Sequence, residues 1–174
     1  MKHAFCAAAA LAFGLSTAAV AAPAAPPADP QIAHIAYTAG QIDIASAKQA
    51  LGISKNPAVR AFATEMVRDH TAVNDKALAL VKKLHVTPEA NPTSASLEKM
   101  ADAKRKQYDT LTGPAFDRGY VASEVAYHKA VNAALRGTLI PDAKNPELKS
   151  LLRTGLKLFE EHQAHAEHLA AQLK

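Results

Sequence analysis

The sequence predicts an all-α protein, built as a four-helix bundle with a crossover segment that carries an additional helix. In four long stretches, apolar side chains recur every three or four residues, which places them along one face of a helix. Two of these stretches open with the same pair of residues, Asn56-Pro57 and Asn145-Pro146, a combination typical of helix starts. No stretch of the sequence alternates between polar and apolar residues as a strand would.

The first 30 residues are expected to precede the bundle. Residues 1–21 combine one basic residue, Lys2, with an Ala/Leu-rich apolar run and the small-x-small sequence Ala19-Val20-Ala21, which is typical of a cleaved signal peptide. A membrane anchor is the alternative, but the apolar run is shorter than the ~20 residues that a bilayer span needs. Residues 22–30 are rich in proline and alanine and are expected to be an extended tether. Residues 31–174 are then the helical bundle domain, exported to the periplasm or secreted.

The charge of the mature chain excludes few partners. Without the leader the chain has 19 basic and 16 acidic side chains, a net charge of +3, and no cysteine. The densest basic run, Lys104-Arg105-Lys106, lacks the glycine-aromatic pattern of nucleic-acid modules, so no nucleic-acid partner is predicted. No transmembrane segment is expected in the mature chain, and the sequence identifies no partner protein.

The first two helices are expected to form an antiparallel hairpin. The stretch from Ile32 to Leu51 has a stripe of small residues at helical spacing, and Gly52 is expected to end it. The second helix is expected from Pro57 to about His85, where Asn56 caps its free N-H groups. The link between the two helices is short, which favours antiparallel neighbours.

The third main helix is expected from Pro114 to about Arg136, followed by a loop from Gly137 to Lys144. A helical stretch from Thr93 to Leu111 precedes it, with a thinner apolar stripe that contains a lysine, so we interpret it as a partly exposed connecting helix. One long connection between the second and third main helices is the arrangement of ferritin-like bundles. The last helix is expected to begin at Pro146, and its opening residues repeat those after Asn56.

Three histidines are predicted on the inner stripes of these helices. His70 lies 13 residues after Pro57 and His128 lies 14 residues after Pro114, which puts both roughly 20 Å along their helices. His162 lies 16 residues after Pro146 and approaches from the opposite end, also near mid-depth. Several carboxylates are expected in or next to this layer: Asp43, Glu65, Asp69 and Glu124.

Histidines and carboxylates on facing helices are the ligands that suit zinc, copper, nickel or iron. Glu124 and His128, four residues apart, can bind one centre. The alternative is that each histidine is a core residue bonded to a carboxylate or tyrosine. No Glu is followed by His three residues later, a pairing that di-iron sites of ferritin type use, so that chemistry is not expected.

The remaining histidines are expected at the surface. His165 is expected to pair with Glu161 one turn earlier or to be a ligand at the rim, and His168 to face solvent. His34 and His85 lie near helix ends. The sequence has no phosphate-binding glycine loop, and no serine stands beside a histidine, so no catalytic residue is predicted.

Three segments together resemble a known family: NPAVRAFATEMVRDHT, TLTGPAFDRGYV and FEEHQAHAEHLA, in the family's order. The likeness extends from about Ile32 to Leu173 and is to the exported bacterial domain-of-unknown-function family number 4142, which is labelled a predicted outer-membrane protein with a ferritin-like helical bundle. Where that family usually has Glu in its first helix, this chain has Asp43, which keeps a carboxylate but shortens it. The resemblance implies the fold and export but no established activity.

Two functional interpretations therefore stay open. In the first, the protein is an exported helical-bundle domain that binds a transition metal or a small ligand between its helices. In the second, it is a metal-free structural or stress-related envelope protein that acts through its surface. A redox enzyme is a weaker third interpretation, and the protein is expected not to be an enzyme.

Overall fold

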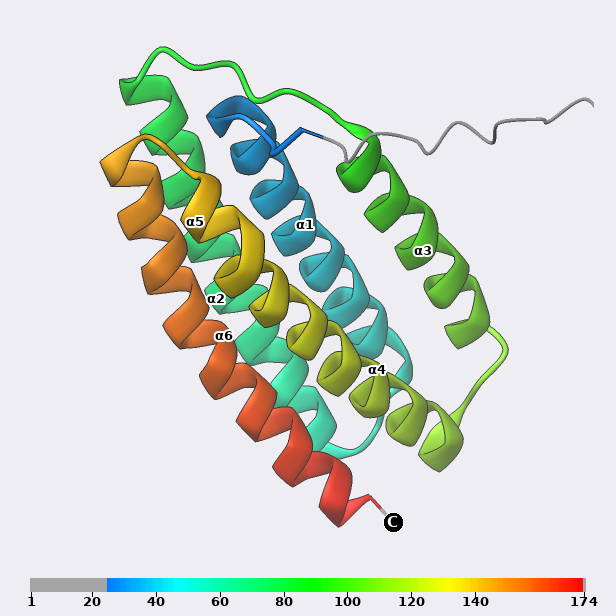
Figure 1. Ribbon diagram of the computed structural model, residues 1–174. Helices are drawn as coiled ribbons and strands as arrows, with labels where there is room; N and C mark the ends of the chain where they lie inside the picture. The colour runs from blue at the N-terminus through cyan, green and yellow to red at the C-terminus, as the bar shows by residue number, and fades with distance from the viewer. Residues whose placement is uncertain (1–24, 174) are drawn as a thin grey trace, which may run out of the picture.

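The computed structural model describes residues 25–173, and within them every regular element is a helix. Four long helices form the bundle (Figure 1): α1 (Asp29–Ile53), α2 (Pro57–Lys83), α4 (Gly113–Ala134) and α6 (Pro146–Gln172). The crossover helix α3 (Pro92–Tyr108) lies outside this group of four, beside α1 and near the start of α4. The predicted fold, a ferritin-like bundle whose crossover segment carries an additional helix, is confirmed.

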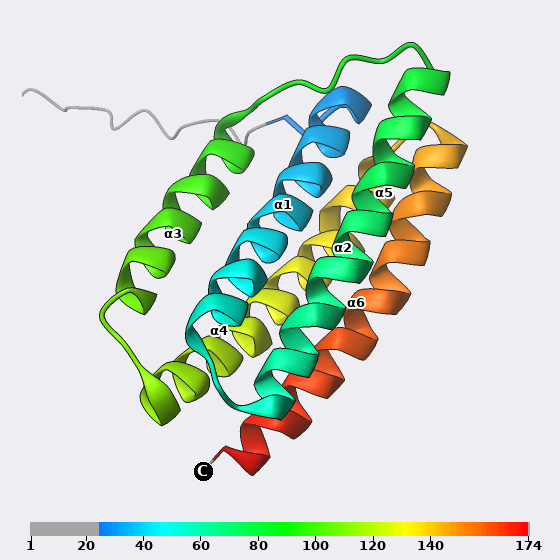
Figure 2. The ribbon, with the colours of Figure 1, turned by 180° about the vertical axis from the view of Figure 1, so that it is seen from behind.

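The crossover makes α2 and α4 run in the same direction, while α1 and α6 run opposite to both (Figures 1 and 2). The short link from Ile53 to Pro57 joins α1 and α2 as an antiparallel pair. The segment from Leu84 to Asn91 carries the chain across the end of the bundle to the start of α3. After α3, the chain is back at the end of the bundle where α2 began, so α4 starts level with α2.

The two predicted Asn-Pro starts are built in the same way. The Asn56 Oδ1 atom accepts hydrogen bonds from the N-H groups of Ala58 and Val59, at 2.9 and 3.4 Å. The Asn145 Oδ1 atom accepts the corresponding bonds from Glu147 and Leu148, at 2.9 and 3.0 Å. Each cap pairs N-H groups that have no partner within the helix, so each fixes where a helix begins.

Helix boundaries differ from the sequence expectation at two places, before α1 and between α4 and α6. The first helix begins at Asp29, so the last two residues of the expected tether are helical. The expected loop from Gly137 to Lys144 is wrong, because α4 continues through a π-helical turn, η1 (Leu135–Leu139), into the short α5 (Ile140–Asp142). Leu135 and Leu139 are buried by this turn, and their packing outweighs the local breaking tendency of glycine and proline.

The hydrophobic core has two parts that lie toward opposite ends of the bundle. One centres on Phe62, Met66, Phe116 and Tyr120, and the other on Ile32, Leu135, Leu148 and Leu152. Met66 and Phe159 are both buried, and each lies about one helical turn from a buried histidine, His70 or His162. Between residues 25 and 173, no helix combines the length and the apolar character needed to cross a bilayer.

Candidate metal centre

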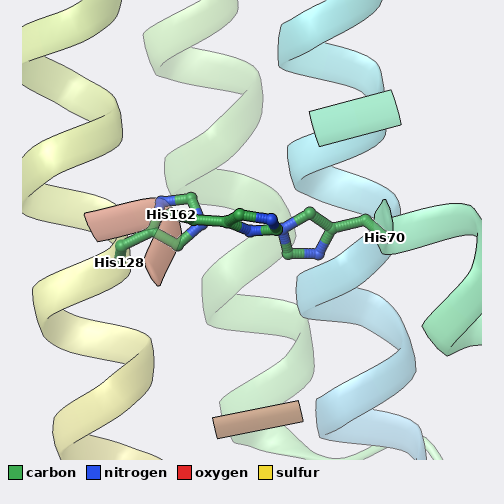
Figure 3. Close-up of side chains that lie close together, drawn as sticks. All are labelled: His70, His128 and His162. Carbon is green, nitrogen blue, oxygen red and sulfur yellow. The ribbon is translucent and has the colours of Figure 1, made fainter. Parts of the chain in front are cut away.

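Three histidines from three helices meet in the interior of the bundle. His70 of α2, His128 of α4 and His162 of α6 are all buried, and their rings point toward one another (Figure 3). The ring centroids are separated by 5.7 Å for His70 and His128, 5.3 Å for His70 and His162, and 5.5 Å for His128 and His162. One nitrogen from each ring lies within 4.8 Å of the other two.

This geometry is close to that of a metal site. In a tetrahedral centre with metal-nitrogen distances of about 2.0–2.1 Å, the ligand nitrogens are roughly 3.3 Å apart. Small side-chain movements therefore suffice to contract the cluster around one ion. The ring of His70 stacks on Phe159, with centroids 4.6 Å apart and planes 10° from parallel, which limits how that ring can turn.

Two buried carboxyl groups adjoin the histidines. The Asp43 Oδ2 atom of α1 lies 3.2 Å from His70 Nε2 and 3.5 Å from His128 Nε2. The Glu124 Oε2 atom of α4 lies 3.6 Å from His128 Nδ1. Asp43, Glu124 and His128 form a second set of potential ligands that shares His128 with the first. All four bundle helices thus contribute to one polar centre.

Two of the rings are oriented by hydrogen bonds from their other nitrogen. His128 Nδ1 lies 3.0 Å from the backbone oxygen of Glu124, to which it donates, and this leaves Nε2 facing Asp43. His162 Nε2 donates to Asp69 Oδ2 over 3.1 Å, and this leaves Nδ1 toward the interior. A carbonyl or carboxylate that accepts from the outer nitrogen is the usual support of a metal-binding histidine.

Asp69 is itself held by Arg68, its neighbour in sequence. The Arg68 Nε and Nη2 atoms donate to the two carboxylate oxygens over 2.6 and 2.9 Å. This guanidinium is the main reason that the pKa of Asp69 is lowered, and the hydrogen bond from His162 lowers it further. Asp69 therefore stays ionised and orients His162 from the outer side.

Seven buried polar atoms of this centre have no hydrogen-bond partner: both ring nitrogens of His70, Nε2 of His128, Nδ1 of His162, both carboxyl oxygens of Asp43, and Oε2 of Glu124. His70 Nε2 and Asp43 Oδ2 are 3.2 Å apart, which is close enough for a hydrogen bond, but their relative orientation is unfavourable. Both atoms are therefore unpaired. Each buried group left unpaired costs about 1–3 kcal/mol. A bound cation would satisfy these converging, unpaired nitrogen and oxygen atoms.

Burial keeps the ligands of this centre uncharged when no cation is present. It lowers the pKa of His70 well below its usual value, with His128 as a further cause, and lowers that of His128 to about 4. The pKa of His162 is also lowered, again mainly by burial. Burial raises the pKa of Asp43 to about 8, and burial together with Asp43 raises that of Glu124 well above its usual value.

Comparison with known families identifies the chain. Residues 14–169 match the family described as a domain of unknown function, DUF4142. The chain belongs to this family. The resemblance drawn from the three sequence segments is therefore confirmed. None of the curated proteins matches the chain.

The structural comparison supports the fold of this DUF4142 chain. It is similar to the crystal structure of DUF305, a predicted secreted protein from Streptomyces coelicolor, with a TM-score of 0.70 and 14% sequence identity. The likeness covers 82% of this chain and 91% of the other. At this identity the comparison establishes a shared helical fold.

The structure divides the predicted site residues of this DUF4142 chain into two groups. His70, His128, His162, Asp43 and Glu124 lie together in the interior. Glu65 and Asp69 lie on the outer side of His162, where they form a third set of potential ligands with it. Glu65 was expected in the interior carboxylate layer, but its position on α2 directs it to the surface between α2 and α6.

The pairing predicted for His165 is wrong. His165 Nδ1 bonds to Glu65 Oε2 on α2 over 2.7 Å, instead of pairing with Glu161 on its own helix. His168 is exposed as expected, and so is His85, while His34 is half-buried and lies 3.4 Å from the Thr38 hydroxyl. The supporting role of Arg68 was also missed, although its place beside Asp69 in the sequence is a signal that could have indicated it.

Proposed function

We propose that this DUF4142 domain binds a divalent transition metal through His70, His128 and His162, with Asp43 as a fourth ligand. The observation that carries the proposal is the convergence of unpaired, buried nitrogen and oxygen atoms from four helices. Three imidazoles and a carboxylate suit zinc, copper, nickel or iron. Glu124 is the candidate to replace or join Asp43, because Asp43, Glu124 and His128 form one set of potential ligands.

Asp69 and Glu65 have different roles in this proposal. Asp69 orients His162 by accepting from its outer nitrogen, so it acts through a ligand. Glu65 and His165 lie beside it at the surface, where they provide a polar approach from solvent to His162. The proposal assigns the protein a binding function and no catalytic step.

The direct test is metal analysis of protein purified without an affinity tag. We expect close to one equivalent of a single metal per chain after equilibration with zinc, copper, nickel or iron and removal of excess ion. His70→Ala, His128→Ala and His162→Ala should each lower the affinity by at least a hundredfold. His168→Ala, an exposed histidine on α6, is the matched control and should bind as the unaltered protein does.

Two results would overturn the metal proposal. One is wild-type protein that retains none of the four metals, and the other is a set of interior variants that bind as well as His168→Ala. Either result would favour the metal-free structural or stress-related role. The pKa shifts support that second candidate, because neutral imidazoles and protonated carboxyls can stay buried without a cation.

We also propose that residues 1–21 are a signal peptide, that residues 22–30 are a tether, and that the bundle domain works in the periplasm or outside the cell. The basic, apolar and small-residue pattern of the first 21 residues supports this, and the similar DUF305 protein is described as a predicted secreted protein. Mass spectrometry of the cellular protein should find Ala22 at the N-terminus. Recovery of chains that still begin at Met1 would contradict cleavage.

A further inference from the structure

A cavity of about 1060 Å³ lies beside the crossover helix α3, and all four bundle helices contribute to its lining, with α1, α3 and α4 forming its outer part. Pockets that hold small molecules in proteins usually measure a few hundred to about 1000 Å³. The cavity reaches from the outer face, beside Met100, to the polar centre, where Asp43 and Glu124 are among its lining residues. It is separate from the surface approach at Glu65 and His165, which lies between α2 and α6.

The way α3 is attached explains why this space exists. Of its 17 residues only Ser94, near the start, and Tyr108, at the end, are buried. Between these two anchors, Leu97, Met100 and Ala101 face the cavity, and Met100 is 59% exposed. Leu97 packs in part against the hydrophobic core, but α3 makes far fewer contacts with α4 than with α1, so the rest of its apolar stripe faces the cavity.

The opposite walls are made of small residues. Ala36 and Ala39 of α1 and Ala122, Ala126 and Ala130 of α4 line the cavity, four residues apart along α4. Larger side chains at these positions would fill the space between α3 and α4. A hydrogen bond links these two helices, because the Tyr127 hydroxyl of α4 donates to the Ala39 carbonyl oxygen of α1 over 2.8 Å.

The inner end of the cavity offers unpaired polar atoms. Both carboxyl oxygens of Asp43 and Oε2 of Glu124 are buried and have no hydrogen-bond partner, and both residues line the cavity. Lys104, at the exposed face of α3, is the one basic residue among those that line it within residues 25–173. An anionic group would therefore meet two carboxyl groups at the inner end and no cation.

We infer that this cavity binds an elongated, mainly apolar molecule that ends in an uncharged hydroxyl group, with the hydroxyl at Asp43 and Glu124. A hydroxyl both donates and accepts, so it complements a carboxyl group in either protonation state. The apolar body would cover Leu97, Met100 and the alanine walls, which otherwise stay in contact with water. The inference does not depend on metal binding, because a metal-free protein keeps the same cavity.

The test uses the full chain as recovered from cells, freed of metal by a chelator, and the neutral fluorophore N-phenyl-1-naphthylamine. We expect saturable binding of about one dye per chain, with displacement by 1-dodecanol. Ala126→Phe should weaken dye binding at least tenfold, because the ring occupies the cavity. Ala133→Phe is the matched control, since Ala133 is an exposed residue of α4 that does not line the cavity, and it should bind as the wild type does.

The polar end is tested separately. Glu124→Leu should weaken displacement by 1-dodecanol about fivefold and leave dye affinity unchanged. Circular dichroism must show that each variant is as helical as the wild type. If Glu124→Leu does not fold, the comparison of dye affinity between Ala126→Phe and Ala133→Phe still tests whether the cavity is the binding site. Equal dye affinity in those two phenylalanine variants would overturn the inference.

Two further outcomes would also overturn it. Stronger displacement by laurate than by 1-dodecanol would show that the polar end does not select an uncharged group. Ala25 and Pro27 line the cavity, so the chain's own preceding segment is another occupant to test. Dye binding that appears only after the residues before Ala25 are removed would identify that segment as the occupant.

Discussion

The protonation of Asp43 leads to a quantitative prediction about metal binding. Burial raises the pKa of Asp43 to about 8, so at pH 7 its carboxyl group carries a proton when no metal is present. A carboxyl group must lose that proton to act as a ligand. The histidines contribute little to this effect, because burial lowers the pKa of His128 to about 4 and that of His70 well below its usual value.

The metal affinity should therefore rise about tenfold for each pH unit between pH 6.5 and 8, and then level off. Each tenfold step corresponds to about 1.4 kcal/mol, which is the free energy of releasing one proton per pH unit. If Glu124 also binds, its raised pKa makes the rise steeper than tenfold per unit. A site made of the histidines alone would show almost no slope in this range.

Competition with a chromophoric zinc chelator, corrected for the chelator's own pH dependence, measures this slope. Calorimetry in buffers of different ionisation enthalpy counts the released protons independently. Asp43→Asn keeps the size of the side chain and removes the proton, so its slope should be one unit smaller than that of the wild type. An affinity that does not change between pH 6.5 and 8, or an identical slope in Asp43→Asn, would refute the proposed role of Asp43.

Three other predictions follow from the same contacts. Asp69→Ala should weaken zinc binding 10- to 100-fold without changing its stoichiometry, because Asp69 orients His162, whereas Asp75→Ala on the exposed face of α2 should have no effect. The metal-free protein should become less stable to urea as the pH rises from 7 to 8, because the Asp43 carboxyl group ionises in the unfolded chain and keeps its proton in the folded one. Below pH 7 the three buried histidines oppose this loss, because their lowered pKa values make the unfolded chain bind more protons than the folded one. Saturating zinc should reverse the trend between pH 7 and 8, and a stability that rises over that range without metal would contradict it. Asn56→Ala and Asn145→Ala should each lower the free energy of unfolding in urea by about 1 kcal/mol. Their effects should add, because the two caps lie at opposite ends of the bundle (Figure 1). Unchanged stability in either variant would contradict the capping role.

The sequence predicted the elements of the bundle and the depth of its histidines because both depend on local rules. Proline and asparagine define where α2 and α6 begin, and a constant rise per residue then places His70 and His162 near mid-depth. The same rules failed at η1, where Gly137 and Pro141 indicated a loop. There the burial of Leu135 and Leu139 depends on contacts with the rest of the bundle, which a local pattern does not contain.

The partners of the polar residues were less predictable than their depths. Glu65 and His165 lie on the borders between the inner and outer faces of their helices, and a small rotation of either helix decides which way they point. The cavity was not predictable at all. The sequence shows that α3 has a thin apolar stripe, but the distance between that stripe and the alanines of α4 exists only in the packed structure.

The crossover gives the polar centre two different sides. On one side, α2 and α6 pack closely, and the surface there carries Glu65, Asp69 and His165, which are groups that attract a cation. On the other side, α1 and α4 make few direct contacts, and α3 covers the space beside them. The buried residues of α3, Ser94 and Tyr108, lie near its two ends. Asp43 reaches both sides, because it lies against His70 and also lines the cavity. A cation that enters from the first side would draw the Asp43 carboxylate toward the histidines and away from the cavity, so metal and apolar ligand would compete for the same carboxyl group.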